Sequence, residues 1–213
     1  MMNIQIAIAD DHPMIIDGLQ NILPHYPELT LKGCYKNGKA LLEGLETQLP
    51  DVLLLDIQMP DITGDELTPI LLKKYPDLKI LVLTNFDSAL YANNMFKRGA
   101  SGYLLKTAEN TTLIEAIKTV YSGGQFIEST MKEKIREMSI RDKNASFSKS
   151  TLTPREIEIL QLLVNGCTAP QIAEQCFLSL RTVVNYRTSI MLKLNVNNTA
   201  MLVKKALTTG LAQ

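Results

Sequence analysis

The sequence predicts an α/β protein in which a doubly wound, five-stranded parallel sheet is followed by a small all-α domain of four helices. Three observations lead to this prediction. Over residues 1–122, short apolar runs of strand length alternate with longer amphipathic stretches of helical period. Some of these runs are apolar throughout, which is typical of parallel strands covered on both faces. From Leu152 onward the period is helical only, which indicates a second domain of a different class.

The first domain, residues 1–122, is expected to contain consecutive strand–helix units. The strands are predicted at Gln5–Ala9, Thr30–Tyr35, Val52–Asp56, Lys79–Thr84 and Gly102–Leu105. The helices are predicted near Met14–Leu23, Gly38–Gln48, Asp65–Tyr75, Ser88–Arg98 and Glu109–Tyr121. Proline or glycine follows most of the helical stretches, as is usual where helices end. Units of this kind in a row form a parallel sheet with helices on both faces.

Residues 123–150 are expected to be a linker. Gly123-Gly124 ends the alternation of strands and helices. One weak helix is predicted at Ser129–Ile140, because Met131, Ile135 and Met138 share a narrow stripe. Residues 141–150 are polar, with two lysines, several serines and an asparagine, and they are predicted to be a flexible tether.

Residues 151–213 are predicted to form a helix-turn-helix domain. The segment Thr153-Pro154-Arg155-Glu156 contains an N-cap, a proline at the first helical position and the glutamate of a capping box, so a helix begins there and runs to Leu163. Three further helices are predicted, from Thr168 to near Cys176, at Thr182–Leu194 and at Thr199–Thr209. A short helix, a tight turn and a second helix with basic residues facing outward are typical of this motif.

Composition and charge restrict the function. The chain has no apolar run of the 18 or more residues that span a membrane and no export signal, and its three cysteines form no paired motif, so we expect a cytoplasmic protein without disulfides or zinc. Residues 1–122 contain 10 Lys and Arg against 15 Asp and Glu, a net charge of −5, whereas residues 151–213 contain 6 against 3, a net charge of +3. No acid follows Glu174. This asymmetry favours a metal or phosphate site first and a polyanionic partner last.

Acidic residues end two of the predicted strands. Asp10-Asp11 follows one apolar run and Asp56 ends another, so three carboxylates converge at the carboxyl edge of the sheet if these strands are neighbours. Two such charges about 5 Å apart repel by about 3 kcal/mol at an effective dielectric of about 20. A cation is therefore expected between them, and ligands that are all oxygen favour Mg²⁺.

These residues carry a resemblance to a known family. Asp10-Asp11, Asp56, Thr84 and Lys106 match the receiver domain of two-component response regulators in type, order and spacing, and the segments Asp56-Ile-Gln-Met-Pro-Asp-Ile-Thr-Gly64 and Gly102-Tyr-Leu-Leu-Lys106 resemble its signatures. The stretch from Leu152 resembles the LuxR-type helix-turn-helix. In this order the two are similar to a NarL/FixJ-type response regulator, and the resemblance covers nearly the whole chain apart from the linker. It implies a flavodoxin-like fold for the first domain.

The resemblance also implies a role for each residue of the site. Asp56 is implied as the phosphoacceptor, phosphorylated by a sensor histidine kinase. Its Mg²⁺ ligands are implied to be Asp11, Asp56 and the backbone carbonyl of Gln58, with Asp10 acting through water. Lys106 and Thr84 are implied to bind phosphoryl oxygens. Thr84 and Tyr103 form the implied switch, in which an inward Tyr103 marks the active state. We interpret His12 as a polar neighbour of the site.

The predicted recognition helix departs from the family pattern. Val184 stands where relatives commonly have lysine, and Tyr186 stands where they have histidine. Because valine can touch a thymine methyl group but cannot hydrogen-bond a guanine, base preference should differ from that of relatives. The residues expected to contact DNA are Arg181, Thr182, Val184, Asn185, Arg187, Thr188 and Lys193. We expect a dimer on phosphorylation, bound to an inverted repeat in promoter DNA.

Other interpretations remain open for each residue. Asp10-Asp11 could cap the next helix, and Lys106 or the basic residues after Glu174 could be solvated. The protein is expected not to be an enzyme, because Asp56-Ile-Gln lacks the second acid of a haloacid-dehalogenase-like phosphatase and the loops leave no room for a cap. A DNA-binding regulator that works without phosphate is the other alternative.

Overall fold

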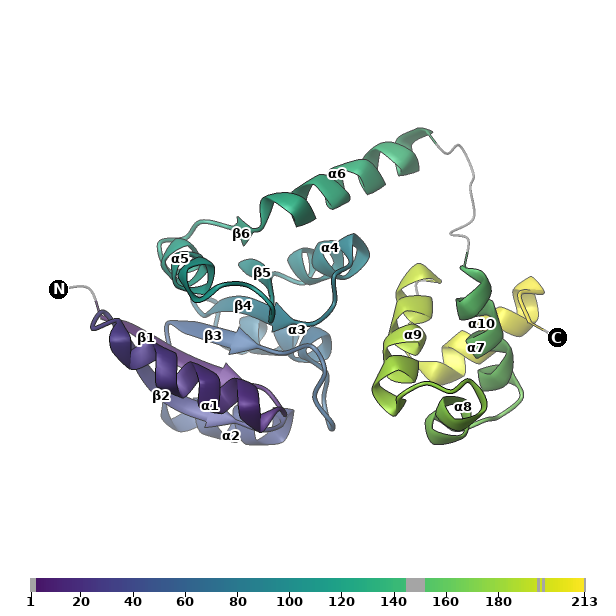
Figure 1. Ribbon diagram of the computed structural model, residues 1–213, viewed down its shortest axis with the longest axis horizontal. Coiled ribbons are helices and arrows are strands. Elements are labelled where there is room, and N and C mark those ends of the chain that lie inside the picture. Colours follow the sequence, from purple (N-terminus) through teal and green to yellow (C-terminus); the bar gives the residue numbers. More distant parts are fainter. Residues whose placement is uncertain (1–2, 145–151, 195, 197, 213) are drawn as a thin grey trace. The chain divides into compact units, whose positions relative to one another are not determined.

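The computed structural model describes residues 3–144, 152–194, 196 and 198–212. The chain divides into two compact units, residues 1–138 and 139–213, and each is described here by itself (Figure 1). The first unit extends beyond residue 122, because part of the segment expected to be a linker belongs to it.

The first unit is built on a parallel sheet with the strand order β2-β1-β3-β4-β5-β6. The prediction of a doubly wound parallel sheet is confirmed, and a short sixth strand is added at one edge. The strands are β1 (Ile4–Ala9), β2 (Leu29–Tyr35), β3 (Val52–Leu55), β4 (Lys79–Thr84), β5 (Gly102–Leu105) and β6 (Phe126–Ile127). The sixth was not predicted because a two-residue strand has no periodicity to detect.

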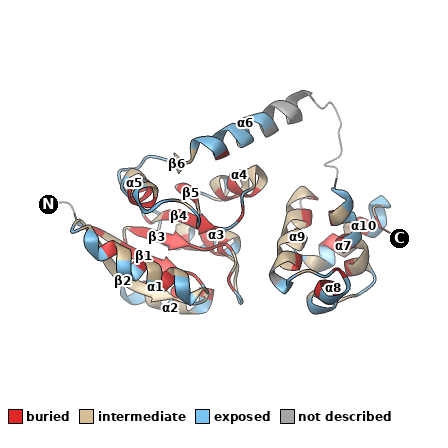
Figure 2. Ribbon diagram, viewed as in Figure 1, coloured by how far each residue is buried: buried red, intermediate tan, exposed pale blue. Residues whose placement is uncertain are grey.

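Helices cover both faces of this sheet. They are α1 (Pro13–Ile22), α2 (Gly38–Thr47), α3 (Gly64–Lys74), α4 (Ala89–Lys97) and α5 (Asn110–Tyr121), with a 3₁₀ turn η1 at Leu23–His25. Apolar side chains of α1 and α5 pack together with alternate residues of β1, β3, β4 and β5 in one core cluster. Figure 2 shows that these central strands are almost entirely buried. Burial on both faces explains their continuous apolar runs.

The loop that follows β3 is held by local features that the sequence encodes. Thr63 and Glu66 form a capping box at the start of α3. A Cβ added to Gly64 would lie 2.3 Å from the backbone oxygen of Asp56, so only glycine allows α3 to begin this close to the end of β3. The carboxylate of Asp61 accepts hydrogen bonds from the backbone N–H groups of Gly38 and Lys39, each at 2.8 Å. The loop is thereby fastened to the first turn of α2.

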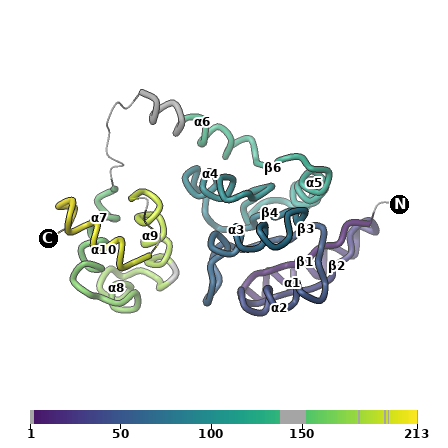
Figure 3. Tube along the Cα trace, turned by 180° about the vertical axis from the view of Figure 1, so that it is seen from behind, coloured from purple at the N-terminus to yellow at the C-terminus, as the bar shows by residue number. Residues whose placement is uncertain are grey.

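The first unit continues through β6 into α6 (Ser129–Asn144), a path that Figure 3 follows from behind. The helix extends four residues beyond the predicted Ser129–Ile140. Met131 is buried, with 3% of its surface exposed, and Ile135 is half-buried, so the predicted stripe contacts the first unit. The side chain of Met138 and the tether from residue 145 to 150 lie outside the described residues.

The described residues of the second unit from Leu152 onward form four helices, as predicted. They are α7 (Pro154–Val164), α8 (Ala169–Gln175), α9 (Leu180–Lys193) and α10 (Thr199–Thr209). Apolar residues of all four, among them Leu160, Ile172, Val183 and Leu202, form a single core. α9 begins two residues before the predicted Thr182, because Ser179 is the N-cap and accepts a hydrogen bond from the Thr182 N–H at 3.0 Å. Among the described residues, no helix is long and apolar enough to cross a membrane.

Candidate functional site

The site predicted in the first unit lies at the carboxyl ends of four neighbouring strands. Asp10 follows β1, Asp56 follows β3, Thr84 is the last residue of β4, and Lys106 follows β5. The parallel order β1-β3-β4-β5 brings these ends to one edge of the sheet. Asp10, Asp56 and Thr84 are each only 1% exposed. The sheet therefore gathers side chains that are far apart in the sequence and holds them away from solvent.

Lys106 contacts two of the acids directly. Its Nζ lies 2.6 Å from Oδ2 of Asp10 and 2.8 Å from Oδ2 of Asp56, and its side chain is 3% exposed. Buried charges require partners of opposite sign, and one ammonium between two carboxylates leaves a net negative charge. The pocket is therefore electrostatically suited to a further cation.

The carboxyl of Asp56 is held in an unusual state. Burial raises its pKa, while the charge and the hydrogen bond of Lys106 oppose that shift. One oxygen bonds Lys106, but the buried Oδ1 has no hydrogen-bond partner among the described residues. An unpartnered buried oxygen is rare in folded proteins and indicates a position where a ligand belongs. Asp56 thus combines an engaged oxygen with one that remains available.

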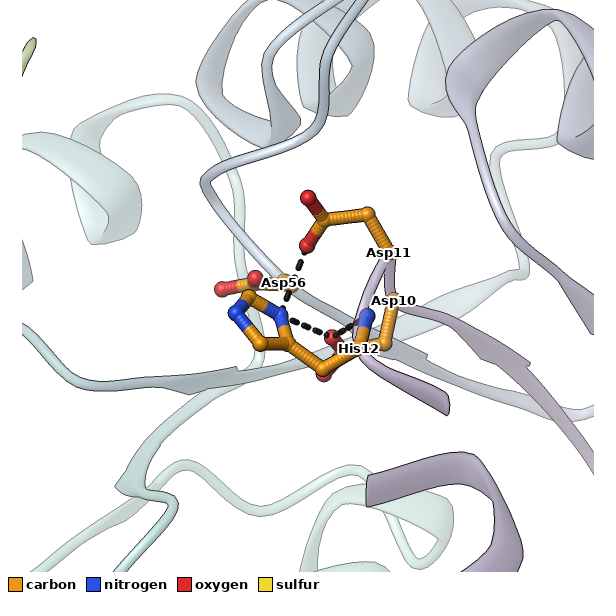
Figure 4. A group of neighbouring side chains, drawn as sticks. All are labelled: Asp10, Asp11, His12 and Asp56. Carbon is orange, nitrogen blue, oxygen red and sulfur yellow. Dashed lines mark hydrogen bonds and ion pairs between the residues drawn. The ribbon is translucent and has the colours of Figure 1, made fainter. Parts of the chain in front are cut away.

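Asp11 and His12 complete the cluster around this oxygen (Figure 4). Nδ1 of His12 lies 2.7 Å from Oδ1 of Asp11 and 3.0 Å from Oδ1 of Asp10. Potential ligand atoms of Asp10, Asp11, His12 and Asp56 all lie within 4.8 Å of one another. Asp11 is exposed, so a hydrated ion can reach the cluster from solvent. Several carboxylate oxygens beside an unpartnered buried one suit a hard divalent cation such as Mg²⁺, which keeps part of its water.

Gln58 lies two residues beyond Asp56 and is half-buried. Its backbone hydrogen bond to the Asp56 carboxylate favours the charged form and so lowers the pKa of that group, against the larger effect of burial. That its backbone carbonyl binds a metal ion stays a prediction.

Tyr103 lies inward. It is 1% exposed, and its hydroxyl donates a hydrogen bond to the backbone oxygen of Phe86 at 2.7 Å. Burial raises the pKa of the Tyr103 hydroxyl, which therefore remains a donor. The Phe86 N–H donates to the Thr84 hydroxyl oxygen at 3.3 Å, and the Phe86 ring stacks on Tyr91 with centroids 4.1 Å apart. Phe86 thus joins the two predicted switch residues.

The loop that follows Thr84, which we call the switch loop, contacts α6 through an ion pair that sequence analysis did not identify. Nζ of Lys134 lies 2.6 Å from both carboxylate oxygens of Asp87. The two residues are 47 positions apart, and no periodic pattern joins them, so nothing in the sequence indicated the contact. The ion pair places the linker helix against the loop that follows Thr84.

In the second unit, α9 carries most of the residues predicted to contact DNA. Val184, Asn185, Arg187 and Thr188 are half-buried on this helix, and the Thr188 hydroxyl donates to the Val184 carbonyl at 3.0 Å. The Thr182 hydroxyl shares a hydrogen bond of 2.7 Å with that of Ser179. The backbone of Arg181 lies in the first turn of α9, and its side chain is outside the described part.

Lys193, which we expected to contact DNA phosphates, forms an ion pair that the sequence did not indicate. Its Nζ lies 2.6 Å from Oε2 of Glu156, which is 3% exposed, and its contact with DNA stays a prediction. Glu156 also accepts hydrogen bonds from the Ser189 hydroxyl at 2.8 Å and the Thr153 N–H at 2.7 Å. Although burial by itself would raise it, the pKa of the Glu156 carboxyl is lowered, because these donors bind the carboxylate. A buried carboxylate needs a cation, and Lys193 provides it. In the sequence, the capping box had identified Glu156 only as a residue at the start of a helix.

Both units match known protein families. Residues 6–118 match the response regulator receiver domain, and residues 150–206 match the bacterial regulatory proteins of the luxR family. The transcriptional regulatory protein DegU of Brevibacillus brevis is 36% identical over an alignment of 222 positions, which covers 97% of this chain and 94% of that protein. The oxygen regulatory protein NreC of Staphylococcus carnosus is 33% identical over 209 residues, which cover 95% of this chain and 96% of that protein.

Solved structures resemble the chain over most of its length. A complex of the two-component response regulator RcsB with DNA has a TM-score of 0.62 and 25% identity, covering 96% of this chain and 98% of that one. RcsB of Salmonella enterica serovar Typhimurium, bound to a promoter in the presence of the phosphomimetic BeF₃⁻, has a TM-score of 0.63 and 26% identity, covering 95% and 97%.

Proposed function

This chain belongs to the two-component response regulators that join a receiver domain to a LuxR-type DNA-binding domain, and we propose that phosphorylation of Asp56 controls its binding to promoter DNA. The observation that carries the proposal is the pocket in which the unpartnered Oδ1 of Asp56 lies among Asp10, Asp11 and Lys106. The phosphodonor is a phosphohistidine of a sensor kinase, as in the family.

The residues of the pocket divide the chemistry between them. An oxygen of the Asp56 carboxylate attacks phosphorus, the bond from phosphorus to the donor histidine breaks, and the imidazole leaves with the electron pair. Asp11, Asp56 and the Gln58 carbonyl would hold Mg²⁺, with Asp10 acting through water, and the ion would neutralise charge on the transferring oxygens. Lys106 begins paired with Asp10 and Asp56 and binds a phosphoryl oxygen as charge accumulates there. The Thr84 hydroxyl donates to another oxygen.

The new charge is transmitted through Thr84 and Tyr103. A phosphoryl group of charge near −2 at Asp56 attracts the Thr84 hydroxyl, and Tyr103 occupies the space beside it, with its hydroxyl on the Phe86 carbonyl. The phosphoryl group biases an equilibrium that already exists. A change from mostly inactive to mostly active takes roughly 3–5 kcal/mol, which a few charge-assisted hydrogen bonds supply.

The output is dimerisation and binding of two DNA half-sites. The acid-free segment after Glu174 supports a polyanionic partner, and Thr182, Val184, Asn185, Arg187 and Thr188 of α9, with Arg181, are the residues proposed to contact it. RcsB, which resembles this chain in fold, was solved in complex with DNA. Two half-sites one helical turn apart add their contacts, so a dimer binds an inverted repeat more tightly than either monomer.

Phosphorylation is tested with acetyl phosphate and Mg²⁺. The wild-type protein should gain one phosphoryl group that is labile to alkali, as an acyl phosphate is, detected by mass spectrometry of the intact chain. Asp56→Asn should gain none, whereas Asp77→Asn, at an exposed aspartate of the same unit, should behave as the wild type. Equal labelling of Asp56→Asn would refute the assignment of the phosphoacceptor.

Genome-wide footprinting, with and without phosphorylation, tests the output. Phosphorylated wild-type protein should protect paired half-sites and sediment as a dimer, and Asp56→Asn should do neither at the same concentration. Equal protection by both proteins would instead support the alternative of a regulator that works without phosphate.

A further inference from the structure

The turn between α8 and α9 contains a backbone conformation that its residue does not favour. Phe177 has φ 53°, and among the described residues it is the one non-glycine with positive φ, alongside Gly99, Gly123, Gly166 and Gly210. A bulky residue in the left-handed region is a genuine outlier, and such outliers gather at functional sites.

The end of α7 shows what this position ordinarily needs. There Gly166 has φ 80°, and the next N–H, of Cys167, donates to the Leu162 carbonyl at 3.0 Å. The end of α8 repeats the pattern, since the Leu178 N–H donates to the Ala173 carbonyl at 2.9 Å. Both ends are Schellman motifs, in which glycine is the usual left-handed residue. Glycine would therefore serve the fold better than phenylalanine at position 177.

The phenylalanine ring does not contribute to the core either. Phe177 is 96% exposed, the most exposed of the large apolar side chains described. Leu180, the first residue of α9, is 51% exposed, and Val184 lies one turn further along the same face. We name Phe177, Leu180 and Val184 the apolar edge. A ring that strains the backbone and lacks contacts within its own unit points to a binding partner.

We propose that the apolar edge contacts the 5-methyl groups of thymine in the major groove, with Phe177 as a specificity-determining residue. This inference rests on the proposed function and deepens it. The first residues of a recognition helix contact base edges, and Phe177 lies two residues before the Ser179 N-cap of α9. Apolar side chains, phenylalanine included, discriminate thymine through its methyl group.

Charge and size favour DNA over a protein partner. The chain has no acid after Glu174, so the turn and α9 belong to a segment whose only charged side chains are cationic, which suits a polyanion. A stable protein interface buries about 800 Å² on each partner, far more than three side chains at the end of one helix provide.

The test uses the phosphorylated full chain. A pool of randomised duplexes is enriched on the wild-type protein, and the selected duplex is then synthesised with thymine or with uracil, which lacks the methyl group, at each half-site position. Fluorescence anisotropy gives Kd. We expect the enriched half-sites to contain thymine, and each replacement at a contacted position to weaken wild-type binding about three- to fivefold.

The informative variant is Phe177→Gly, because it removes the ring while relieving the backbone. Its melting temperature should equal or exceed that of the wild type, so weaker binding to the thymine duplex would not arise from misfolding. At the positions that the ring contacts, uracil should no longer weaken binding. Phe177→Asn, which also tolerates the left-handed region, should behave alike, and Ile157→Ala, at an exposed apolar residue of α7, should bind as the wild type.

The inference is overturned if Phe177→Gly binds the selected duplex as tightly as the wild type, or if uracil weakens both proteins equally. Unchanged DNA binding with loss of transcription would also overturn it and assign the ring to a protein partner. If the wild-type protein enriches no duplex, the proposed function itself fails. The two failures are thus distinguishable.

Discussion

Replacing Glu156 with glutamine tests how α9 is held. The carboxylate is 3% exposed and binds three donors, the Lys193 ammonium at 2.6 Å, the Thr153 N–H at 2.7 Å and the Ser189 hydroxyl at 2.8 Å. Thr153 begins α7, whereas Ser189 and Lys193 lie on α9. The one side chain therefore connects the first helix of the domain to the recognition helix.

The magnitude follows from the loss of charge. Glutamine retains one acceptor oxygen, which can accept from Lys193 and the Thr153 N–H as Oε2 does, but its NH₂ group replaces the Oε1 that accepts from Ser189. The retained hydrogen bonds lose the charge of their acceptor. A hydrogen bond to a charged group contributes about 1.5–3 kcal/mol and a neutral one about 0.5–1.5. Because the Lys193 side chain is 24% exposed and regains water, we expect Glu156→Gln to lose about 2 kcal/mol in total. For a domain of about 60 residues, that lowers the melting temperature by roughly 8–16 °C.

The effect should depend on pH with a definite sign. The pKa of Glu156 is lowered from its ordinary 4.5 in the folded state, so its stabilisation is fully present above that value and is lost as pH falls through the lowered pKa. The difference in unfolding free energy between wild type and Glu156→Gln should therefore be largest near pH 7. It should diminish as the solution is acidified below about 4.5.

Calorimetry of the full chain measures both effects, and we expect the two compact units to give separate transitions, each of which is analysed by itself. Added Mg²⁺ should identify the receiver transition by raising its melting temperature. Glu158→Gln is the matched control, since Glu158 lies on the same helix but is half exposed, with an ion pair to nearby Arg155 and a long contact of 4.0 Å from the Cys176 thiol. Equal losses for the two variants, or a difference that persists at low pH, would refute the reasoning.

Three further predictions concern the receiver domain. Gly64→Ala should lower its stability by about 2 kcal/mol, measured by urea unfolding, because the new Cβ meets the Asp56 backbone oxygen. Gly18→Ala, inside α1 and with nothing within 4 Å of the new Cβ, should instead raise stability by up to about 1 kcal/mol, because alanine favours a helix interior. Mg²⁺ at about 100 times its Kd should stabilise the wild type by about 2.7 kcal/mol in thermal unfolding and stabilise Asp56→Asn much less; equal stabilisation would place the ion elsewhere. Lys134→Glu should speed amide exchange in the switch loop, measured by mass spectrometry, whereas Lys132→Glu on the same helix should not, and its cost in stability should stay below about 1 kcal/mol because both partners of the pair are about half exposed.

Much of the fold could be predicted because its signals are local. The start of α7 was predicted at the observed residue, since Thr153 and Glu156 encode the cap within four positions. Strands β1 to β5 were predicted within one residue, because buried parallel strands have continuous apolar runs. The start of α9 was missed by two residues, since both Ser179 and Thr182 can cap a helix.

The gathering of Asp10, Asp56 and Lys106 could also be predicted, because strand ends in a parallel sheet meet at one edge. Pairs with no such rule could not. The ion pair between Lys193 and the buried Glu156 was not predicted, since a sequence does not reveal which cation a buried carboxylate will bind. Phe177 was not singled out, because hydrophobicity alone does not report a left-handed backbone or an exposed ring.

The short strand β6 bears on how the receiver can be isolated. Its two residues pair with Gly102 and Tyr103 of β5, so without them the strand that holds Tyr103 would become the unprotected margin of the sheet. Exposed edge strands of this kind readily form hydrogen bonds with strands of other chains. A fragment truncated after Ser122 would thus present a self-associating surface beside its own switch, and a dimer seen in such a fragment would be an artefact of truncation rather than a response to phosphate.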